Sequence, residues 1–234
     1  MAQNQDLKRK GGAYPDHQMS RNHAAPPLHI RVPTMRDFPN GMMPWSDVHL
    51  PVDILLFTAE ECEYLACLAF LNYYWTSFHE HLGCVVFATS GESGEGALKI
   101  ALMRSAKGSF GRGDSLVTLK DAITILRPKA AFSVGCCLGL NPESTKRGDV
   151  VVPYKLVTES FIIPLSKNML KLQTVVGPGW YPPLKHPEDA EPIQVHPNSV
   201  IFSGSQFNTK QRHMSEPHII AFEREGEGKI LFYI

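Results

Sequence analysis

The stretch "AAFSVGCCLGLNPESTKRGDVVVP", from Ala130 to Pro153, contains two short apolar runs joined by a segment rich in glycine and polar residues. Each run has the length and apolar character of a strand that is buried on both faces of a sheet. The first run is followed at once by Gly135, Cys136 and Cys137, and small residues let a ligand approach the backbone closely. The stretch predicts two central strands with a ligand-accessible turn after the first.

The two adjacent cysteines leave three interpretations open: a redox pair, half of a metal site, or small packing residues. Adjacent cysteines rarely form a disulfide, because their Cα atoms are too close for relaxed geometry. The five cysteines show no disulfide-framework spacing, which fits a reducing compartment. No histidine stands near Cys136 or Cys137 in the sequence to complete a zinc-ligand pattern. We favour packing and expect neither a metal nor another cofactor.

The composition excludes several classes of protein. The 234 residues include 23 basic and 23 acidic side chains, so no net charge favours nucleic acid or an anionic membrane. No apolar stretch approaches the roughly 18 residues of a membrane span, and the N-terminus carries charge without an apolar core. We expect a soluble, cytoplasmic protein that binds neither nucleic acid nor membrane.

The chain divides near residue 45. Residues 1–45 mix proline, glycine, asparagine and histidine without a regular period, which predicts a disordered or surface-draped arm. Residues 46–234 are expected to form one domain. Apolar runs predict strands at 53–58, 84–88, 130–134, 149–153 and 200–204, and periodic segments predict helices at 60–71 and 119–126. The alternation predicts an α/β fold, a three-layer sandwich with a central mixed sheet flanked by helices.

Two glycine-containing loops follow predicted strands. The loop "SGESGEG" opens with Ser90 and Gly91, and the second begins at Gly135. In open α/β sheets, ligands bind where loops converge at the carboxyl ends of strands, so we expect both loops there. An ordinary strand-to-helix turn also favours glycine, and that alternative remains open. The first loop is not a Walker loop, because it lacks the final Gly-Lys-Ser/Thr.

Acidic residues follow two of the predicted strands. Glu60, Glu61 and Glu63 lie in the first turn of the predicted helix, where Thr58 and Glu61 have capping-box spacing. The helix dipole favours negative charge there whatever the function. In "FEREGEGKI" the acidic residues beginning at Glu223 read either as solvated helix charge or as carboxylates that hold a polar ligand. The periodicity of the sequence does not decide between these readings.

Five blocks of the chain together resemble the nucleoside phosphorylase and nucleosidase superfamily. They are "VDILLFTAEECEYLA", "SGESGEGALKIAL", "ILRPKAAFSVGCCLGLNPESTKRGDVVVP", "VIFSGSQFN" and "FEREGEG". They cover about residues 50 to 234 in the order of the family, and the Gly-Asp-Val-Val signature is the most specific. The resemblance is greatest to immune-type animal proteins that carry this domain beside death-type or NACHT signalling modules. It implies a homo-oligomer and signalling partners of those types.

The resemblance also implies roles for individual residues. Glu63 matches the acidic residue that positions the attacking water in the nucleosidases, and Glu225 matches the carboxylate that holds the ribose hydroxyls. Phe207 stands where the family places an aromatic ring against the purine. Arg224 replaces a methionine that is more common in the family's Glu-Met-Glu signature. The other implied substrate-binding residues are Ser90, Gly91, Gly135, Cys136, Cys137 and Glu223.

The implied reaction is cleavage by water of the N-glycosidic bond of a purine nucleoside or nucleotide. Water is favoured over phosphate, because Glu92 and Glu95 in the first glycine loop would repel phosphate. The resemblance makes ATP one candidate substrate, whose triphosphate would contact basic residues among Lys210, Arg212, His213 and Arg224. The alternatives are a phosphate-dependent phosphorylase and a catalytically inactive nucleotide-binding or oligomerisation module of a signalling protein.

The end of the chain bears on catalysis. The family's proton donor to the purine is an aspartate on the strand after the Glu-Met-Glu helix, and the sequence stops at Ile234 before that strand. We therefore expect a C-terminally incomplete domain, with the catalytic form being a longer chain. Loss of a general acid typically slows such a reaction about a hundredfold or more.

Overall fold

The computed structural model describes most of the predicted domain and part of the N-terminal arm. The described residues are 30–38, 41–90, 96–105, 115–140, 145, 148–158, 162–165, 167–168, 171, 194–204 and 219–223.

The first sheet has five strands in the order β2-β3-β4-β1-β5. The central strand β1 pairs in parallel with β4 and β5, whereas β3 is antiparallel to both β2 and β4. The strands are β1 (Ile54–Thr58), β2 (Trp75–His79), β3 (Gly83–Ser90), β4 (Leu98–Arg104) and β5 (Ala130–Ser133).

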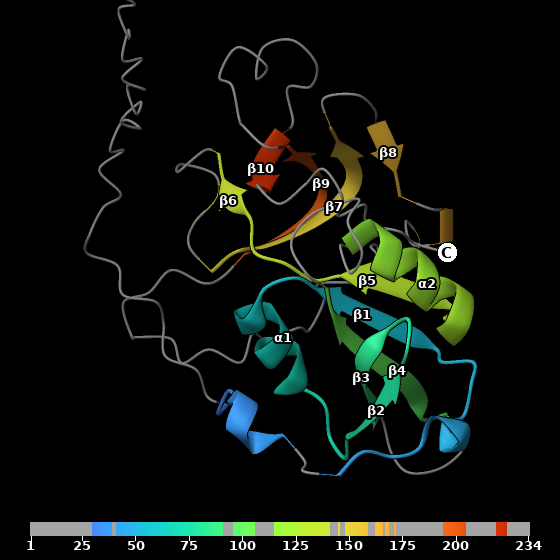
Figure 1. Cartoon of the computed structure of the whole chain (residues 1–234). Coiled ribbons are helices and arrows are strands. Elements are labelled where there is room, and N and C mark those ends of the chain that lie inside the picture. The colour runs from blue at the N-terminus through green and yellow to red at the C-terminus, as the bar shows by residue number, and fades with distance from the viewer. Residues whose placement is uncertain are drawn as a thin grey trace, which may run out of the picture.

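Helices α1 (Glu61–Leu68) and α2 (Ser115–Leu126) pack on opposite faces of this sheet (Figure 1). Side chains alternate between the faces of a strand, so Leu55 and Phe57 join the α2 core while Leu56 joins the α1 core. The sheet and its two helices form three layers. Within the described part of the chain, no helix is long and apolar enough to cross a membrane.

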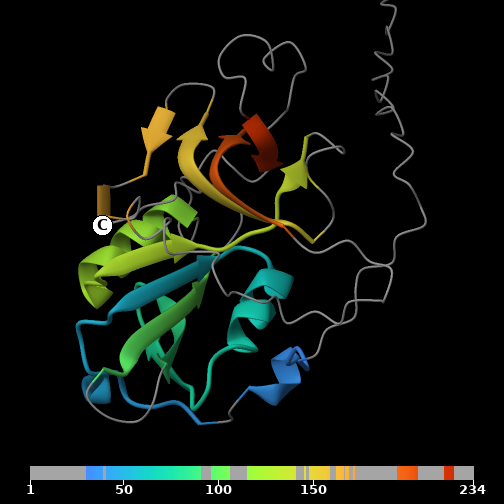
Figure 2. The ribbon, with the colours of Figure 1, turned by 180° about the vertical axis from the view of Figure 1, so that it is seen from behind.

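The second sheet has the order β6-β10-β9-β7-β8. Its inner strands β7, β9 and β10 are parallel, and the outer strands β6 and β8 are antiparallel to their neighbours. Figures 1 and 2 show this sheet beyond one edge of the first, with the chain after β5 leading directly into β6. The strands are β6 (Leu138–Gly139), β7 (Val150–Val157), β8 (Ile162–Pro164), β9 (Val195–Ser203) and β10 (Ile219–Glu223).

The α/β class and the mixed strand arrangement are confirmed. Each of the five predicted strands is present, although β7 ends four residues later and β9 begins five residues earlier than predicted, and hydrogen bonding divides the strands between two sheets. The first predicted helix ends earlier than expected, at Leu68, and the second begins earlier, at Ser115. Strands β2 and β4 are not predicted by the sequence patterns. Both pair with β3 in antiparallel orientation, so this half of the first sheet is antiparallel.

The described part of the N-terminal arm contacts the first sheet and α1. It contains two 3₁₀ turns, η1 (Met35–Asp37) and η2 (Trp45–Asp47). The Trp45 ring lies 4.5 Å from the ring of His79 on the edge strand β2. Met42 forms an isolated parallel bridge to Thr76 on the same strand.

Candidate functional site

The parallel strands β1, β4 and β5 of the first sheet all end at the same end of the sheet, which is here called the carboxyl edge. In the register of these strands Thr58 lies opposite Arg104, and Phe57 lies opposite Ser133. Loops that follow parallel strands converge where ligands bind in open α/β sheets. The carboxyl edge is therefore the candidate ligand-binding site.

Glu63 is the buried carboxylate of this edge, with a residue exposure of 5%. It is the third residue of α1, and its Oε2 atom accepts backbone N–H groups from Ala59 at 3.1 Å and Glu60 at 2.9 Å. Glu60 is the N-cap and Glu63 completes the capping box, so the predicted box of Thr58 and Glu61 is wrong. Thr58 is instead the last residue of β1, where it pairs with Arg104, and its hydroxyl donates to the Met103 carbonyl of the neighbouring strand at 3.3 Å.

The other oxygen of Glu63 joins a second loop. Its Oε1 atom accepts the backbone N–H of Cys136 at 2.9 Å, although the two residues are 73 positions apart. Hydrogen bonds to an ionised carboxylate are shorter and stronger than neutral ones. Glu63 therefore connects the start of α1 to the loop after β5 and is held in one orientation from both sides.

The small residues that the sequence predicted beside a ligand lie in this second loop. Gly135, Cys136 and Cys137 are all exposed, and neither cysteine is in a disulfide. The structure thus brings together Glu63 and the Gly-Cys-Cys turn, two features that were predicted separately. Among the described residues no group of three or more histidine, cysteine, aspartate or glutamate side chains is arranged to hold a metal ion.

The second sheet reaches the same place through β6 and β10. Leu138, which follows Cys137, pairs with Phe222, and Glu223 pairs with Ser203 at the parallel ends of β10 and β9. The carboxyl end of β10 therefore lies beside the Gly-Cys-Cys turn. This places the backbone of Glu223, another predicted site residue, next to the loop that Glu63 holds.

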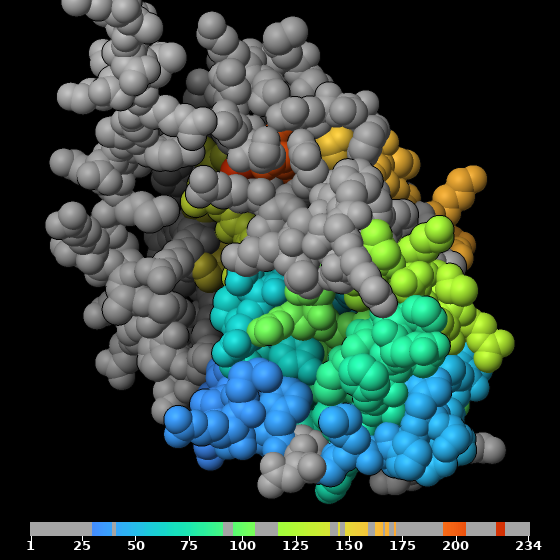
Figure 3. All heavy atoms as spheres, viewed as in Figure 1, coloured from blue at the N-terminus to red at the C-terminus, as the bar shows by residue number. Residues whose placement is uncertain are grey.

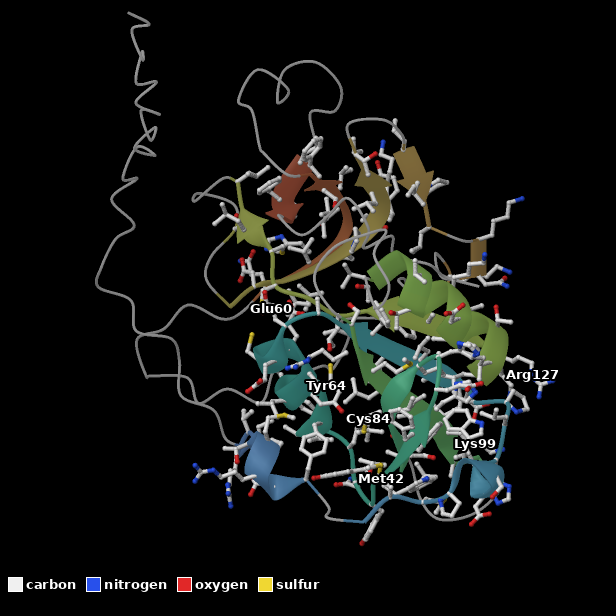
Figure 4. The ribbon with its side chains drawn as sticks, viewed as in Figure 1. Met42, Glu60, Tyr64, Cys84, Lys99 and Arg127 are labelled. Carbon is white, nitrogen blue, oxygen red and sulfur yellow. The ribbon has the colours of Figure 1, made fainter. Side chains whose placement is uncertain are left out.

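Ser90 does not lie at this edge. Because β3 is antiparallel to β4, Ser90 pairs with Leu98 at the start of β4, whereas Thr58 pairs with Arg104 at its end. Ser90 itself therefore does not lie beside the Gly-Cys-Cys turn as expected, and loop residues 91–95 lie outside the described residues. Figure 4 shows the two ends apart, with Glu60 at the carboxyl edge and Lys99 at the opposite end of the sheet.

Ser105 occupies the place that was expected for Ser90. It follows β4, is 6% exposed, and donates from both its N–H and its hydroxyl to the Thr58 carbonyl, at 2.9 and 3.4 Å. The sequence patterns do not point to Ser105, because they do not predict β4 as a strand. The apolar run from Ile100 to Met103 was the signal that could have found it.

Burial and the charge of Glu63 determine the electrostatics around the first turn of α1. Burial, with a smaller contribution from the Glu63 carboxylate, raises the pKa of the Cys67 thiol to about 11. Burial also raises the pKa of the Tyr64 phenol far above its ordinary value. At the rim, Arg104 lies 3.2 Å from the Glu61 carboxylate. The first turn of α1 thus combines the buried Glu63 carboxylate with an exposed Glu61–Arg104 ion pair.

The Gly-Asp-Val-Val signature has a structural role at the opposite end of the second sheet. Asp149 accepts the backbone N–H of Gln194 at 3.0 Å and contacts Nε2 of His196 at 2.9 Å, which ties the start of β7 to β9. Gly148 before it has a φ of 100°, in the left-handed region that side chains disfavour. The signature therefore links the start of β7 to the start of β9.

Several predicted site residues lie outside the described residues. These are Gly91, Glu92, Glu95, Phe207, Lys210, Arg212, His213, Arg224, Glu225 and the side chain of Glu223.

No family model matches the sequence, and no curated protein matches it. Solved structures do match the fold. A 5'-methylthioadenosine/S-adenosylhomocysteine nucleosidase from Neisseria meningitidis, in complex with methylthio-immucillin-A, aligns with a TM-score of 0.51 and 15% identity over 73% of this chain and 74% of that chain. The futalosine hydrolase of Helicobacter pylori aligns with a TM-score of 0.52 and 18% identity over 74% of each chain.

An S-adenosylhomocysteine nucleosidase from Streptococcus pyogenes, in complex with 5-methylthiotubericidin, aligns with a TM-score of 0.50 and 17% identity over 74% of this chain and 73% of that chain. At such identities the similarity shows the fold alone. The phosphorylase/hydrolase-like fold that the sequence predicted is confirmed. The resemblance to animal immune-type proteins stays a prediction.

Proposed function

We propose that the protein cleaves the N-glycosidic bond of a purine nucleoside with water, and that Glu63 positions this water. One observation carries the proposal: a buried carboxylate lies at the carboxyl edge, oriented by backbone N–H groups from two loops. The fold adds support, because the similar structures include nucleosidases and a futalosine hydrolase.

The chemistry needs a group in this position. Cleavage of the bond gives the sugar oxocarbenium character, so a nucleophile must lie beneath C1′ in a fixed orientation. A carboxylate accepts a hydrogen bond from water and so orients its lone pair and takes up its proton. Because Glu63 is already held from both sides, little reorganisation is needed when the substrate binds. In this proposal Glu225 holds the ribose hydroxyls and Phe207 packs against the purine.

Charge favours water over phosphate as the nucleophile. Glu60, Glu61 and Glu63 all belong to the cap and first turn of α1, and like charges at short range disfavour a phosphate dianion. Arg104 would attract phosphate, but its guanidinium is paired with Glu61. A nucleoside without a 5′-triphosphate suits this edge best, and ATP is the alternative substrate.

Release of free base tests the proposal. The purified chain is incubated with adenosine, inosine, 5'-methylthioadenosine or ATP, with and without phosphate, and the products are separated by chromatography. Free base without phosphate supports the proposal and identifies the substrate. A requirement for phosphate would instead establish a phosphorylase.

A binding measurement on the same samples separates the remaining alternative. Saturable binding of a nucleoside or nucleotide in calorimetry, without release of base, would favour a binding module over hydrolysis by this chain. If the chain neither binds these compounds nor releases base, the assignment of a nucleoside site to the carboxyl edge is wrong.

A further inference from the structure

The N-terminal residues 31–38 and 41–43, here called the strap, form a preorganised contact surface. In its first part the Asp37 carboxylate accepts the Thr34 backbone N–H at 2.6 Å and hydroxyl at 2.9 Å, and it pairs with Arg31 at 3.2 Å. The Asp37 N–H in turn donates to the Thr34 carbonyl at 2.9 Å. These local bonds close the η1 turn and fix the direction in which Phe38 leaves it.

Phe38 packs on the helix that carries Glu63. Its ring stacks on Tyr64 with centroids 5.8 Å apart and planes 5° apart, and it meets Tyr74 edge-on at 6.4 Å. The Tyr74 hydroxyl donates to the Asp37 carbonyl at 3.4 Å. Figure 3 shows the blue atoms of the strap directly against the teal atoms around α1, and Figure 4 shows Tyr64 on that helix.

The second part of the strap is anchored to the edge strand β2. Met43 donates its N–H to the Thr76 carbonyl at 2.8 Å, and its own carbonyl accepts the Ser77 hydroxyl at 2.8 Å. The Thr76 hydroxyl donates to the Gly41 carbonyl at 3.3 Å. The strap is therefore fixed on both sides of Phe38.

Tyr64 transmits this contact to the site. Helix α1 has only eight residues, and short helices depend on tertiary packing for their stability. Tyr64 and Glu63 are the buried side chains of its first turn, and Glu63 is the residue that holds the Cys136 N–H. We propose that the strap positions Glu63 through the Phe38–Tyr64 stack and so supports the geometry of the site. The consequence for catalysis rests on the proposed function, whereas the positioning does not.

Amide hydrogen exchange measured by NMR on the full chain without ligand tests the positioning. An aromatic pair contributes about 0.5–1.5 kcal/mol, so Phe38→Ala is expected to speed exchange of the Cys136 amide about two- to tenfold. The Val134 amide, which donates to the Phe57 carbonyl at 2.9 Å in the same part of the fold, is expected to stay unchanged. Phe38→Tyr should restore the slow exchange.

Met35→Ala is the matched control, because Met35 belongs to the same turn and is 46% exposed. It should leave the Cys136 amide unaffected. Equal acceleration at Cys136 and Val134 in Phe38→Ala would show a general loss of stability and overturn the proposal. An unchanged Cys136 amide would overturn it as well.

Kinetics then separate the positioning from the proposed function. If the wild-type chain releases base, Phe38→Ala should lower kcat about two- to tenfold with little change in KM, because the water is misplaced while the substrate contacts remain. A change confined to KM would overturn the positioning role in catalysis. If the wild-type chain releases no base, the proposed function fails, and the exchange result still decides whether the strap holds Glu63.

Discussion

Replacement of Glu63 by alanine should destabilise the protein far more than an ordinary surface substitution. The change removes three hydrogen bonds from a side chain that is 5% exposed, two at the start of α1 and one to the Cys136 loop. Loss of a helix cap costs about 1 kcal/mol, and loss of a charge-assisted hydrogen bond costs about 1.5–3 kcal/mol. Because the exposed Cys136 amide regains water, we expect a total of about 2–4 kcal/mol.

Urea unfolding followed by circular dichroism measures this effect. With a slope of about 3 kcal/mol per molar urea for a chain of this size, the midpoint should fall by about 1 M without a change in slope. Glu63→Gln keeps an acceptor oxygen for the helix cap but presents an amide to the Cys136 N–H, so its loss should be about half as large.

Glu61→Ala is the control within the same helical turn. Glu61 is 57% exposed and pairs with Arg104, and exposed ion pairs contribute little. Its midpoint should therefore stay close to that of the wild type. A midpoint for Glu63→Ala that equals the Glu61→Ala value would refute the view that Glu63 joins the two loops.

Four further predictions concern the side chains of Cys67, Asp149 and Asp53. Burial raises the pKa of the Cys67 thiol from 9.0 to about 11. At pH 8 this thiol should therefore be alkylated about a hundredfold more slowly than that of exposed Cys62, as measured by mass spectrometry of the modified peptides. Equal alkylation rates would contradict the burial of Cys67. The same raised pKa makes its contribution to stability full below pH 9 and lost as the pH rises through 11. Asp149→Ala should lower the unfolding free energy by about 2 kcal/mol, because the side-chain link from Asp149 to Gln194 and His196 is lost while the backbone pairing of β7 and β9 remains, and a change under about 0.5 kcal/mol would argue against that side-chain link. Hydrogen bonds from the Lys129 ammonium and the Lys99 N–H lower the pKa of Asp53, so the contribution of the Asp53 carboxylate to stability is present above pH 3.8 and is lost as the pH falls further. Asp53→Asn should therefore reduce the loss of unfolding free energy at acid pH. An unchanged loss would count against the Asp53–Lys129 ion pair.

The local patterns of the sequence predicted the strands that are continuous apolar runs. The segment of β4 was missed because Lys99 and Arg104 interrupt its apolar pattern near both ends. Without β4 the position of Ser90 is mispredicted, since the direction of β3 in the sheet depends on its pairing with β4. With β3 antiparallel, Ser90 moves to the opposite edge and Ser105 takes its place. Strand direction depends on pairing between distant segments, which no local pattern contains.

Glu63 was identified by resemblance, but its environment was not predictable from the sequence. The helix cap is local and follows from the spacing of Glu60 and Glu63, although the sequence offered Thr58 as an equally good cap. The bond to Cys136 depends on how β1 and β5 lie side by side, and only the folded chain shows it. The strap is a similar case, since its irregular composition gave no indication that Phe38 packs on Tyr64.

The most direct test of the central claim is the initial rate of free-base release in phosphate-free buffer for the wild type, Glu63→Gln and Glu61→Gln. The substrate is the nucleoside that the wild-type chain cleaves best. We predict that Glu63→Gln lowers the rate about a hundredfold or more while Glu61→Gln stays near the wild type. Equal rates for Glu63→Gln and the wild type, or release of base only when phosphate is added, would contradict it.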